Sequence, residues 1–503
     1  MNQQGRPTRP ADTNTPVATN SHGMEEPLIF EQGQDNRCGV DIPGIPDYQQ
    51  RLGGLRRNGK IGLPGLAEPQ VVRHYTRLSQ KNFSIDGNFY PLGSCTMKHN
   101  PRLNEKMARL PGFADLHPLQ PISTVQGALA LIDQLAYWLK TLTGMPAVAM
   151  PQAAGAHGEF CGMATIKAAL EARGEKRTKV LAPESAHGTN PATAAALGFV
   201  VESIPANAQG RVDLDVLKAK LGPDVAAIML TNPNTCGLFE RDMIEIAEAV
   251  HAVGAYFYCD GANFNAIVGR VRPADLGIDA MHINLHKTFS TPHGGGGPGA
   301  GPVVLTEELA RFAPLPYVVG DSEGFKLVEQ AKDSIGRLKG FHGQMGMFVR
   351  ALTYMLSHGA DGLWQVASDA VLNANYILAS LKGVMTASFD GPCMHEALFD
   401  DRFLKDTGVT TLDLAKALLD EGFHPMTMYF PLVVHGALLI EPTETESRET
   451  LDRFIEVMRN LAEKAQSGHA DWFHEAPRHT PLRRLDETQA ARKPVLKWVD
   501  ENR

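Results

Sequence analysis

The sequence predicts an α/β protein with a large domain built on a mostly parallel sheet, followed by a smaller α+β domain. Short apolar runs alternate with helical segments between about residues 147 and 305, as expected for strands that are covered by helices on both faces. After about residue 340 the pattern changes. A length of 503 residues also suits two or three domains.

The first 120 residues are predicted to lie outside both domains. Residues 1–25 are rich in Asn, Thr, Gln and Pro and lack the apolar core of a secretory signal, so we expect a disordered leader. Residues 26–120 are rich in Pro and Gly and show few long periodic stretches. We expect them to form an arm that wraps the folded body or a partner subunit.

The large domain is predicted to span residues 121–340. Leucines at helical spacing predict a first helix that begins near Gln126 and ends at Gly144. Further helices are expected at Ala164–Glu171 and Ile244–Val253. The predicted strands are Ala147–Met150, Lys179–Ala182, Val200–Ile204, Ala226–Thr231, Ala255–Tyr258, His282–Leu285 and Pro302–Leu305.

The small domain is predicted to span residues 341–503. It would begin with a long helix over Asp361–Leu381 and end with another over Arg448–Ala465. The segment Thr443–Glu446 has the spacing of a capping box for that last helix. Between the two helices we expect two strand–helix units, formed by His395–Phe399, Leu412–Leu419, Met426–Val434 and Ala437–Ile440.

Composition argues against several classes of function. A net charge of −8 and a pI near 6.1 give no general attraction to nucleic acid or anionic membranes. No apolar run approaches the length of a membrane span. The six cysteines are scattered without a CxxC pair, which disfavours a zinc site or a disulfide framework. We therefore expect no metal site, and reduced thiols in the cytoplasm.

The most informative motif surrounds Lys287. This lysine directly follows a predicted buried strand and precedes a glycine-rich loop, a position where a sheet edge opens into a crevice. A primary amine can form an imine with an aldehyde cofactor, and a site of low dielectric favours its neutral, nucleophilic form. By itself the motif could equally be a flexible loop.

Asp260 makes the cofactor interpretation stronger. It follows the apolar run 255–259, also at the end of a predicted strand. A carboxylate in this position can pair with a protonated pyridine nitrogen, and the pair would make the ring an electron sink. The alternative is an aspartate that caps a turn. A candidate Schiff-base lysine at the end of the next strand favours the functional role.

The loop before the predicted helix near Gly158 is a candidate phosphate site. Its small residues, among them Ala154 and Gly155, would let backbone N–H groups approach a phosphate at the helix N-terminus. His157 would then lie beside the cofactor ring, where its imidazole could stack. A histidine here is more often structural, but its company with Asp260 and Lys287 favours stacking.

Two other loops follow predicted strands. In the loop 231–237, Asn232 or Thr235 could hydrogen-bond the phenolic oxygen of the cofactor, or the segment could be a plain Asn-Pro turn. In the loop 185–191, residues His187, Thr189 and Asn190 could line the crevice or cap the next helix. We also count Ala262 and His286, close neighbours of Asp260 and Lys287, among the candidate cofactor-binding residues.

Together these motifs resemble the glycine decarboxylase (P-protein) family of the glycine cleavage system. The resemblance rests on AAGAHGE, SAHGTNPA, TNPNTCG, CDGANFNAI, NLHKTFSTPHGGGGPGAGP and, in the arm, GNFYPLGSCTMKHNP. It runs from about Glu26 to the C-terminus. P-proteins occur as one long chain or as two subunits of about half that length, and this chain is similar to subunit 2 of the split form.

The resemblance implies a fold of the aspartate-aminotransferase type (fold type I) and pyridoxal 5′-phosphate (PLP) as cofactor. Lys287 matches the Schiff-base lysine of the family, Asp260 the partner of the pyridine nitrogen, and His157 the ring-stacking histidine. The implied reaction decarboxylates glycine and transfers the aminomethyl group to the lipoyl arm of H-protein, so it is classed as an oxidoreduction. The implied partners are P-protein subunit 1, in a heterotetramer, and lipoylated H-protein.

Three points stay open at the level of sequence. Ser94, Cys95 and Thr96 in the arm are candidates for the substrate end of the site, or are simply buried packing residues. A free-standing PLP-dependent decarboxylase or transaminase for a larger amino acid would need an arginine clamp, for which Arg337 is the candidate. A scaffold subunit without chemistry is a third possibility, against which the intact Lys287 and Asp260 argue.

Overall fold

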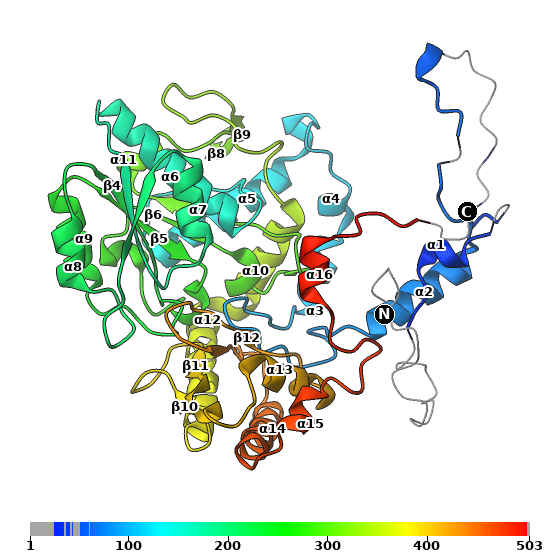
Figure 1. Cartoon of the computed structure of the whole chain (residues 1–503). Helices are drawn as coiled ribbons and strands as arrows, with labels where there is room; N and C mark the ends of the chain where they lie inside the picture. The colour runs from blue at the N-terminus through cyan, green and yellow to red at the C-terminus, as the bar shows by residue number, and fades with distance from the viewer. Residues whose placement is uncertain (1–24, 35–36, 41–42, 44–50, 60, 500–503) are drawn as a thin grey trace.

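A computed structural model describes residues 25–34, 37–40, 43, 51–59 and 61–499. All but the last residue of the predicted leader lies outside the described residues. The described chain contains a large domain, a small domain and an N-terminal arm (Figure 1). None of the described helices is long and apolar enough to cross a membrane.

The large domain is built on a seven-stranded sheet of order β1-β7-β6-β5-β4-β2-β3. Strands β2 to β6 run parallel, whereas β7 is antiparallel to both of its neighbours. All seven predicted strands are confirmed, with ends that differ from the predicted ones by at most three residues. Their bounds are β1 Ala147–Ala149, β2 Lys179–Pro183, β3 Val200–Ile204, β4 Val225–Thr231, β5 Tyr256–Gly261, β6 Ala280–Ile283 and β7 Val303–Leu305.

Helices cover both faces of this sheet, because successive residues of a strand point to opposite faces and the buried strands are apolar on both. In β4, Ile228 and Leu230 join a core with α5 and α9, whereas Ala227 and Met229 join a core with α6. The helices are α5 Gln126–Thr143, α6 Gly155–Ala172, α7 Thr189–Ala196, α8 Leu214–Lys220, α9 Met243–Ala252, α10 Leu285–Thr288 and α11 Glu307–Ala310. Gly144 ends α5 in the left-handed conformation, as predicted. A hairpin of β8 Tyr317–Asp321 and β9 Gly324–Val328 was not predicted.

The small domain contains a four-stranded antiparallel sheet of order β10-β11-β13-β12. Of the predicted run 426–434, only two residues form a strand. The capping-box prediction was wrong, because Ser447 caps the last long helix through the amide of Thr450. The elements are β10 Thr386–Ala387, β11 Ala397–Asp400, α13 Thr411–Asp420, β12 Thr427–Met428, β13 Leu438–Ile440, α14 Arg448–Gln466, α15 Ala470–His474 and α16 Glu487–Arg492.

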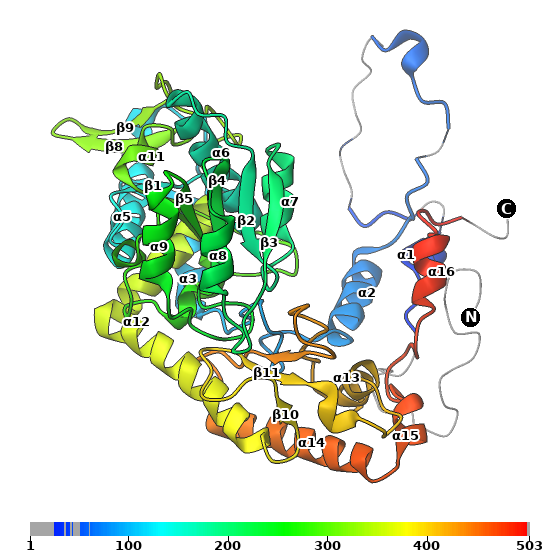
Figure 2. The same cartoon turned by 60° about the vertical axis from the view of Figure 1, so that its left-hand side comes forward.

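Helix α12 (Met345–Leu381) joins the two domains (Figure 2). It starts well before the predicted Asp361 and is interrupted at Gly359, which has φ 65° and ψ −174°. Its residues up to Ala367 pack in the core of the large domain, and its residues from Ala374 onward pack in that of the small domain. The predicted division near residue 340 stays a prediction, since one helix contributes to both cores.

The arm has an outer and an inner part. Helices α1 (Ile29–Gln32) and α2 (Glu68–Gln80) stand away from the two domains in both views (Figures 1 and 2). The inner part contains α3 (Arg102–Ala108), which packs on α12, and α4 (Pro111–Ala114). Before α3 the chain passes along β13, where Leu92 bridges to Ile440. A side chain at Gly93 would collide with Leu439, so the close approach requires glycine.

Candidate active site

A cavity of about 220 Å³ lies where β4, β5 and β6 end in the large domain. The N-terminus of α6, helix α10 and Ser94 of the arm also contribute to its lining. The carboxyl ends of parallel strands are the usual place for a ligand in an open α/β sheet. The cavity therefore brings together residues from all six motifs that the sequence analysis selected.

Lys287 is the only primary amine among the described residues that line this cavity. It lies on the short helix α10, which follows β6, and its side chain is buried. Its Nζ donates a hydrogen bond of 2.7 Å to the backbone carbonyl of Ser94. The arm thus supplies the contact that holds the amine in place.

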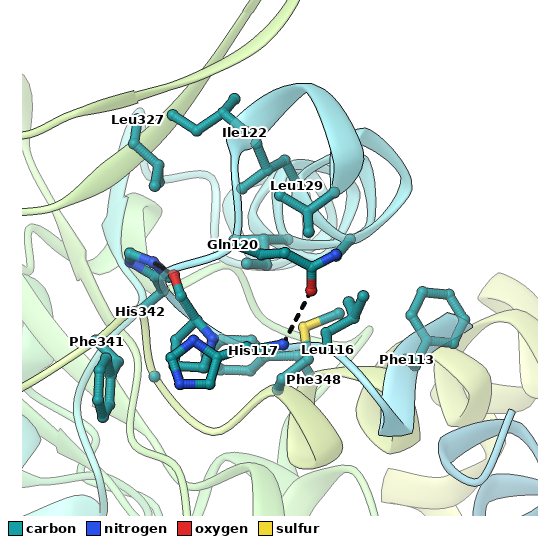
Figure 3. A pocket seen from close by; sticks show the side chains of 16 residues that line it. Phe113, Leu116, His117, Gln120, Ile122, Leu129, Leu327, Phe341, His342 and Phe348 are labelled. Carbon is teal, nitrogen blue, oxygen red and sulfur yellow. Dashed lines mark hydrogen bonds between the residues drawn. The ribbon is translucent and has the colours of Figure 1, made fainter. Parts of the chain in front are cut away.

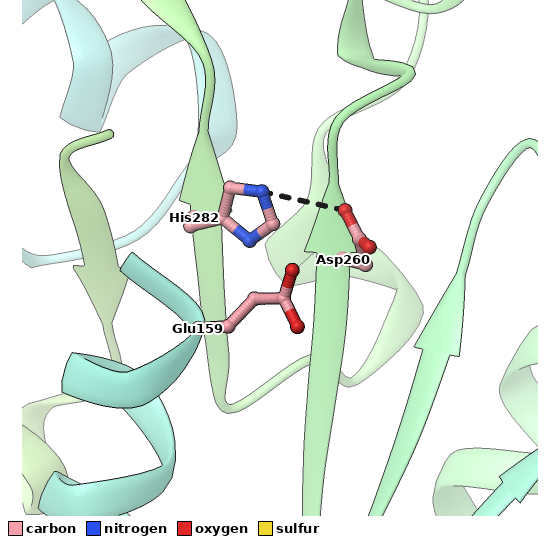
Figure 4. Close-up of side chains that lie close together, drawn as sticks. All are labelled: Glu159, Asp260 and His282. Atoms are coloured by element: carbon pink, nitrogen blue, oxygen red, sulfur yellow. Dashed lines mark ion pairs between the residues drawn. The ribbon is translucent and has the colours of Figure 1, made fainter. Parts of the chain in front are cut away.

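Asp260 ends β5 on the same side of the cavity and is buried in a network of polar partners (Figure 4). Its Oδ1 lies 3.3 Å from Nε2 of His282 and accepts a 2.9 Å bond from the amide of Ala262. Burial acts to raise the pKa of Asp260, but His282, the Ala262 amide and Asn190 outweigh it and keep the pKa below its ordinary value. Asp260 is therefore ionised at neutral pH.

Glu159 faces this carboxylate from the first turns of α6 (Figure 4). Burial, followed by the negative charge of Asp260, raises the pKa of Glu159 to about 9. Asn190 joins the two groups, since its amide nitrogen donates to Glu159 Oε2 at 2.7 Å and to Asp260 Oδ2 at 3.1 Å. Two adjacent carboxyl groups are thus kept in opposite protonation states at neutral pH.

The N-terminus of α6 opens into the cavity through Gly155 and Ala156. The first amides of a helix have no partner within it, and they point along the axis toward any anion placed there. Ala154 precedes the helix as its N-cap residue and does not line the cavity. A side chain at Gly155 would collide with Asn284, which explains the glycine.

Of the two candidate histidines, His157 lies differently from the sequence prediction, whereas His187 lines the crevice, one of the two positions left open for it. His157, expected beside the cofactor ring, is not among the lining residues. Its Nδ1 accepts a 3.2 Å hydrogen bond from the amide of Ala153, and its neighbours include Leu338 and Lys339. His187 lines the cavity instead, with its ring edge-on to Phe430 and its Nδ1 3.0 Å from Thr189 Oγ1.

Of the other predicted cofactor-binding residues, some line the cavity and one does not. Thr189, Thr235, Ala262 and His286 line the cavity. Asn232 does not, because its side chain is buried and its Oδ1 accepts the amide of Glu240. Of the three candidates in the arm, Ser94 lines the cavity, whereas Cys95 and Thr96 do not.

Comparisons with known proteins agree with this geometry. Residues 157–313 match the family model "Aminotransferase class-V", and residues 366–481 match "Glycine dehydrogenase, C-terminal domain". A curated protein of Caulobacter vibrioides, "Probable glycine dehydrogenase (decarboxylating) subunit 2", is 67% identical over 99% of this chain and 98% of its own. A protein of Oceanobacillus iheyensis with the same name is 50% identical over 94% of this chain and 98% of its own.

This chain belongs to the glycine dehydrogenase (decarboxylating) subunit 2 family. Solved structures support the fold of the family. A glycine decarboxylase (P-protein) of the glycine cleavage system has a TM-score of 0.70 at 24% identity, covering 82% of this chain and 93% of its own. A cysteine desulfurase from Escherichia coli has a TM-score of 0.58 at 16% identity, covering 75% and 95%. The predicted fold class, fold type I, is confirmed.

The residues in the cavity fit PLP, the cofactor that aminotransferase-type enzymes of this fold use. An amine and an ionised carboxylate face the same space as a helix N-terminus. Three buried polar atoms at the cavity, Thr231 Oγ1, Asn284 Oδ1 and His286 Nδ1, have no hydrogen-bond partner within the described chain. Burial lowers the pKa of His286 to about 3, so this ring is neutral and able to accept or donate a bond.

A second cavity, of about 200 Å³, has a different character (Figure 3). It lies between the arm segment around Phe113–Val125, helix α5 and the start of α12, and most of its lining is apolar. His117 and His342 are its two titratable lining residues. It lacks the amine and carboxylates of the first cavity, so we assign no chemistry to it.

Sequence reasoning missed Glu159 and His282, which complete the Asp260 network. Both lie within motifs that were selected for other residues, AAGAHGE and the stretch before Lys287. The signal that could have found His282 is its register, because β5 and β6 pair Asp260 directly with His282. Glu159 lies one helical turn beyond Gly155, so it faces the same cavity.

Proposed function

We propose that this chain is the PLP-bearing subunit of a glycine dehydrogenase (aminomethyl-transferring). In the proposed reaction glycine loses carbon dioxide and its aminomethyl group passes to the lipoyl arm of an H-protein. The observation that carries the proposal is the meeting of Lys287, Asp260 and the α6 N-terminus in one cavity. Relatives that are 50–67% identical over nearly the whole chain are named glycine dehydrogenase (decarboxylating) subunit 2, which supports the decarboxylation of glycine.

Residues of this chain would hold PLP at four points. Lys287 would bind the aldehyde carbon, and the amides at Gly155 and Ala156, where α6 opens into the cavity, would bind the phosphate. Asp260 would pair with the pyridine nitrogen, and its network with His282 and Asn190 keeps it ionised for that purpose. When bound, PLP supplies an electron sink for the bond that loses carbon dioxide.

We assign the ring-facing position to His187 in place of His157. His187 lines the cavity, and its ring is fixed between the hydroxyl of Thr189 and the ring of Phe430. An imidazole in this position can lie against a flat cofactor ring. His157 is left with a local role, which is to accept the amide of Ala153 before α6.

The alternative function, a free-standing decarboxylase or transaminase for a larger amino acid, is not favoured. That function would need an arginine clamp for a second carboxylate. Arg337, its candidate, forms an exposed pair of 2.5 Å with Glu329 and does not line the cavity. None of the described lining residues is an arginine, which suits a substrate as small as glycine.

The arm suggests how a partner subunit would bind. Its outer part exposes large apolar side chains that neither domain covers: Leu52, Leu55, Ile61, Leu63, Val72 and Tyr75. An extended segment of this kind orders best against another surface. We assign that surface to P-protein subunit 1, in a heterotetramer of two kinds of subunit. All six cysteines are unpaired, which suits our assignment of the reaction to the cytoplasm.

The test is exchange of labelled bicarbonate into the carboxyl group of glycine. The assay would contain this chain with PLP, subunit 1 and lipoylated H-protein, and each component would be omitted in turn. We expect full exchange only with all components present, because the aminomethyl group needs an acceptor. Full exchange by this chain alone would refute the partner requirement and favour a free-standing decarboxylase. Absence of exchange from the complete mixture would refute the proposed reaction.

A further inference from the structure

A second buried cluster, His395, Glu396 and Glu441, lies in the small domain behind the arm. Glu396 directly precedes β11 and Glu441 directly follows β13. Because these antiparallel strands pair Ala397 with Ile440, the two glutamates are brought side by side. All three side chains are completely buried, so the charge on this cluster needs a physical explanation.

The two carboxyl groups are anchored very unequally. Glu441 accepts hydrogen bonds from the Thr96 amide at 2.9 Å, the Thr96 hydroxyl at 2.6 Å and the Asn265 side chain at 3.4 Å. Glu396 accepts only the amide of Ser94 through Oε1, and its Oε2 has no partner within the described chain. Hydrogen bonds from donors favour the ionised form, so the negative charge belongs on Glu441 and the proton on Glu396.

The neighbouring groups agree with this distribution. Burial and the adjacent Glu441 raise the pKa of Glu396 well above its ordinary value. Burial also lowers the pKa of His395 to about 3. The imidazole is therefore neutral, and its Nε2 lies 3.6 Å from Glu396 Oε2. Burial raises the pKa of Glu441 as well, but the hydroxyl of Thr96, the charge of Lys287 and the amide of Thr96 all oppose that rise.

The arm segment that these carboxyls hold is strained and functional. Ser94 and Thr96 both have positive φ angles, 68° and 50°, which side-chain-bearing residues adopt only when their surroundings enforce it. The amides of these same two residues bind Glu396 and Glu441. The backbone carbonyl of Ser94, in the same segment, accepts a hydrogen bond from the amine of Lys287.

We propose that Glu396 and Glu441 are positioning residues that share one proton, held on Glu396, and lock Ser94–Thr96 so that the Ser94 carbonyl faces Lys287. The small domain thereby sets the position and charge environment of the reactive amine without touching the cavity. This inference deepens the proposed function and rests on it for turnover. It can also be tested without turnover, through the pH dependence of the absorbance of PLP bound to Lys287.

The experiment compares Glu441→Gln with Glu396→Gln in the PLP-loaded chain assembled with its partner subunit. Glutamine removes the charge of Glu441 but imitates the protonated form of Glu396. We expect Glu441→Gln to lower the pH midpoint of the absorbance change of bound PLP by about one unit. It should also reduce kcat/KM for the exchange reaction at least about tenfold, because a misplaced reactive group is costly. Glu396→Gln should cause clearly smaller changes in both.

Asp413→Asn is the matched control. Asp413 is another buried carboxylate of the small domain, but it caps α13 and contacts Arg484 rather than the arm. This variant should lose thermal stability while the pH midpoint of bound PLP stays that of the unchanged protein. The midpoint therefore separates positioning from a general loss of structure. If Glu441→Gln fails to fold, Thr96→Val removes the 2.6 Å bond and should shift the midpoint in the same direction.

Three results would overturn the proposal. One is an unchanged midpoint in folded Glu441→Gln or, where that variant does not fold, in Thr96→Val. Another is an effect of Glu396→Gln as large as that of Glu441→Gln. The third is one bound metal ion per chain that Glu441→Gln abolishes, since the cluster would then be a metal site. Failure of glycine exchange in the unchanged complex would instead refute the proposed function. The pH midpoint of bound PLP would still test whether Glu396 and Glu441 position Ser94–Thr96.

Discussion

Two buried acidic clusters lie near Lys287, and each contains two neighbouring carboxyl groups that cannot both be ionised at little cost. Glu159, Asp260 and His282 lie in the large domain and line the cavity. His395, Glu396 and Glu441 lie in the small domain and contact the arm. In each, one carboxyl is anchored by several donors and its neighbour is held protonated by burial. The number of hydrogen bonds that a carboxyl group accepts, rather than its burial alone, thus decides which of the two groups is ionised.

The difference between the clusters lies in what the charge faces. The charge of Asp260 is directed at the cavity, where it can stabilise a cationic ring nitrogen. The charge of Glu441 is directed at the backbone of Thr96 and acts on Lys287 through the arm. The first cluster would therefore affect chemistry directly, whereas the second would affect it through position.

The largest expected effect comes from Lys287, which both clusters serve. Lys287→Ala should abolish turnover, because no other described lining residue offers a primary amine. Borohydride trapping followed by peptide mass spectrometry checks the assignment. Trapping of PLP on a different lysine in the unchanged protein would contradict it.

Asp260→Asn should have the next largest effect and should spare cofactor binding. Loss of the ion pair with the ring nitrogen should raise the barrier by about 3 kcal/mol or more, roughly a hundredfold in kcat. PLP content and kcat should be measured together. A variant with full PLP content and nearly normal kcat would show that the large-domain cluster does not tune the cofactor.

A paired comparison of His187→Ala and His157→Ala tests the revised ring-facing assignment. His187 lines the cavity and His157 does not, so His187→Ala should weaken PLP binding about tenfold or more, in line with the loss of a stacking contact. His157→Ala should change it much less. The dissociation constant of PLP, measured by fluorescence titration, checks both, and the reverse order would restore the original prediction.

The smallest effect is expected at Glu159 and should appear as a change in pH dependence. The pKa of Glu159 is about 9 in the folded protein and near its ordinary value of 4.5 when unfolded. The unfolded chain therefore binds fewer protons between these values, so the free energy of unfolding should fall as pH rises across that window.

Glu159→Gln should make this fall shallower, because glutamine stays neutral throughout. Denaturant unfolding of both proteins at several pH values measures the difference. Identical pH profiles would mean that Glu159 is not held protonated.

The sequence was sufficient for the sheet but only partly for the site. Buried strands such as β4 are continuous apolar runs, and their ends place Asp260 and Lys287 at one sheet edge. The sequence analysis chose His157 rather than His187 for the ring-facing position, although both histidines have small residues as neighbours and the sequence does not show which side chain points into the cavity. Side-chain direction there depends on how α6 packs.

The second cluster was out of reach for a related reason. Glu396 and Glu441 meet only through the register of β11 and β13 and through contact with the distant arm. Neither residue forms a motif with its sequence neighbours. The predicted strand at 426–434 failed similarly, since an apolar run alone does not distinguish a strand from a buried turn.

Helix α12 has a consequence for the way the protein unfolds. Residues of this helix up to Ala367 complete the core of the large domain, and those from Ala374 onward complete that of the small domain. Neither core can be fully assembled unless the same helix is in place, so the two domains are thermodynamically coupled. Calorimetry should therefore show one cooperative transition for both domains.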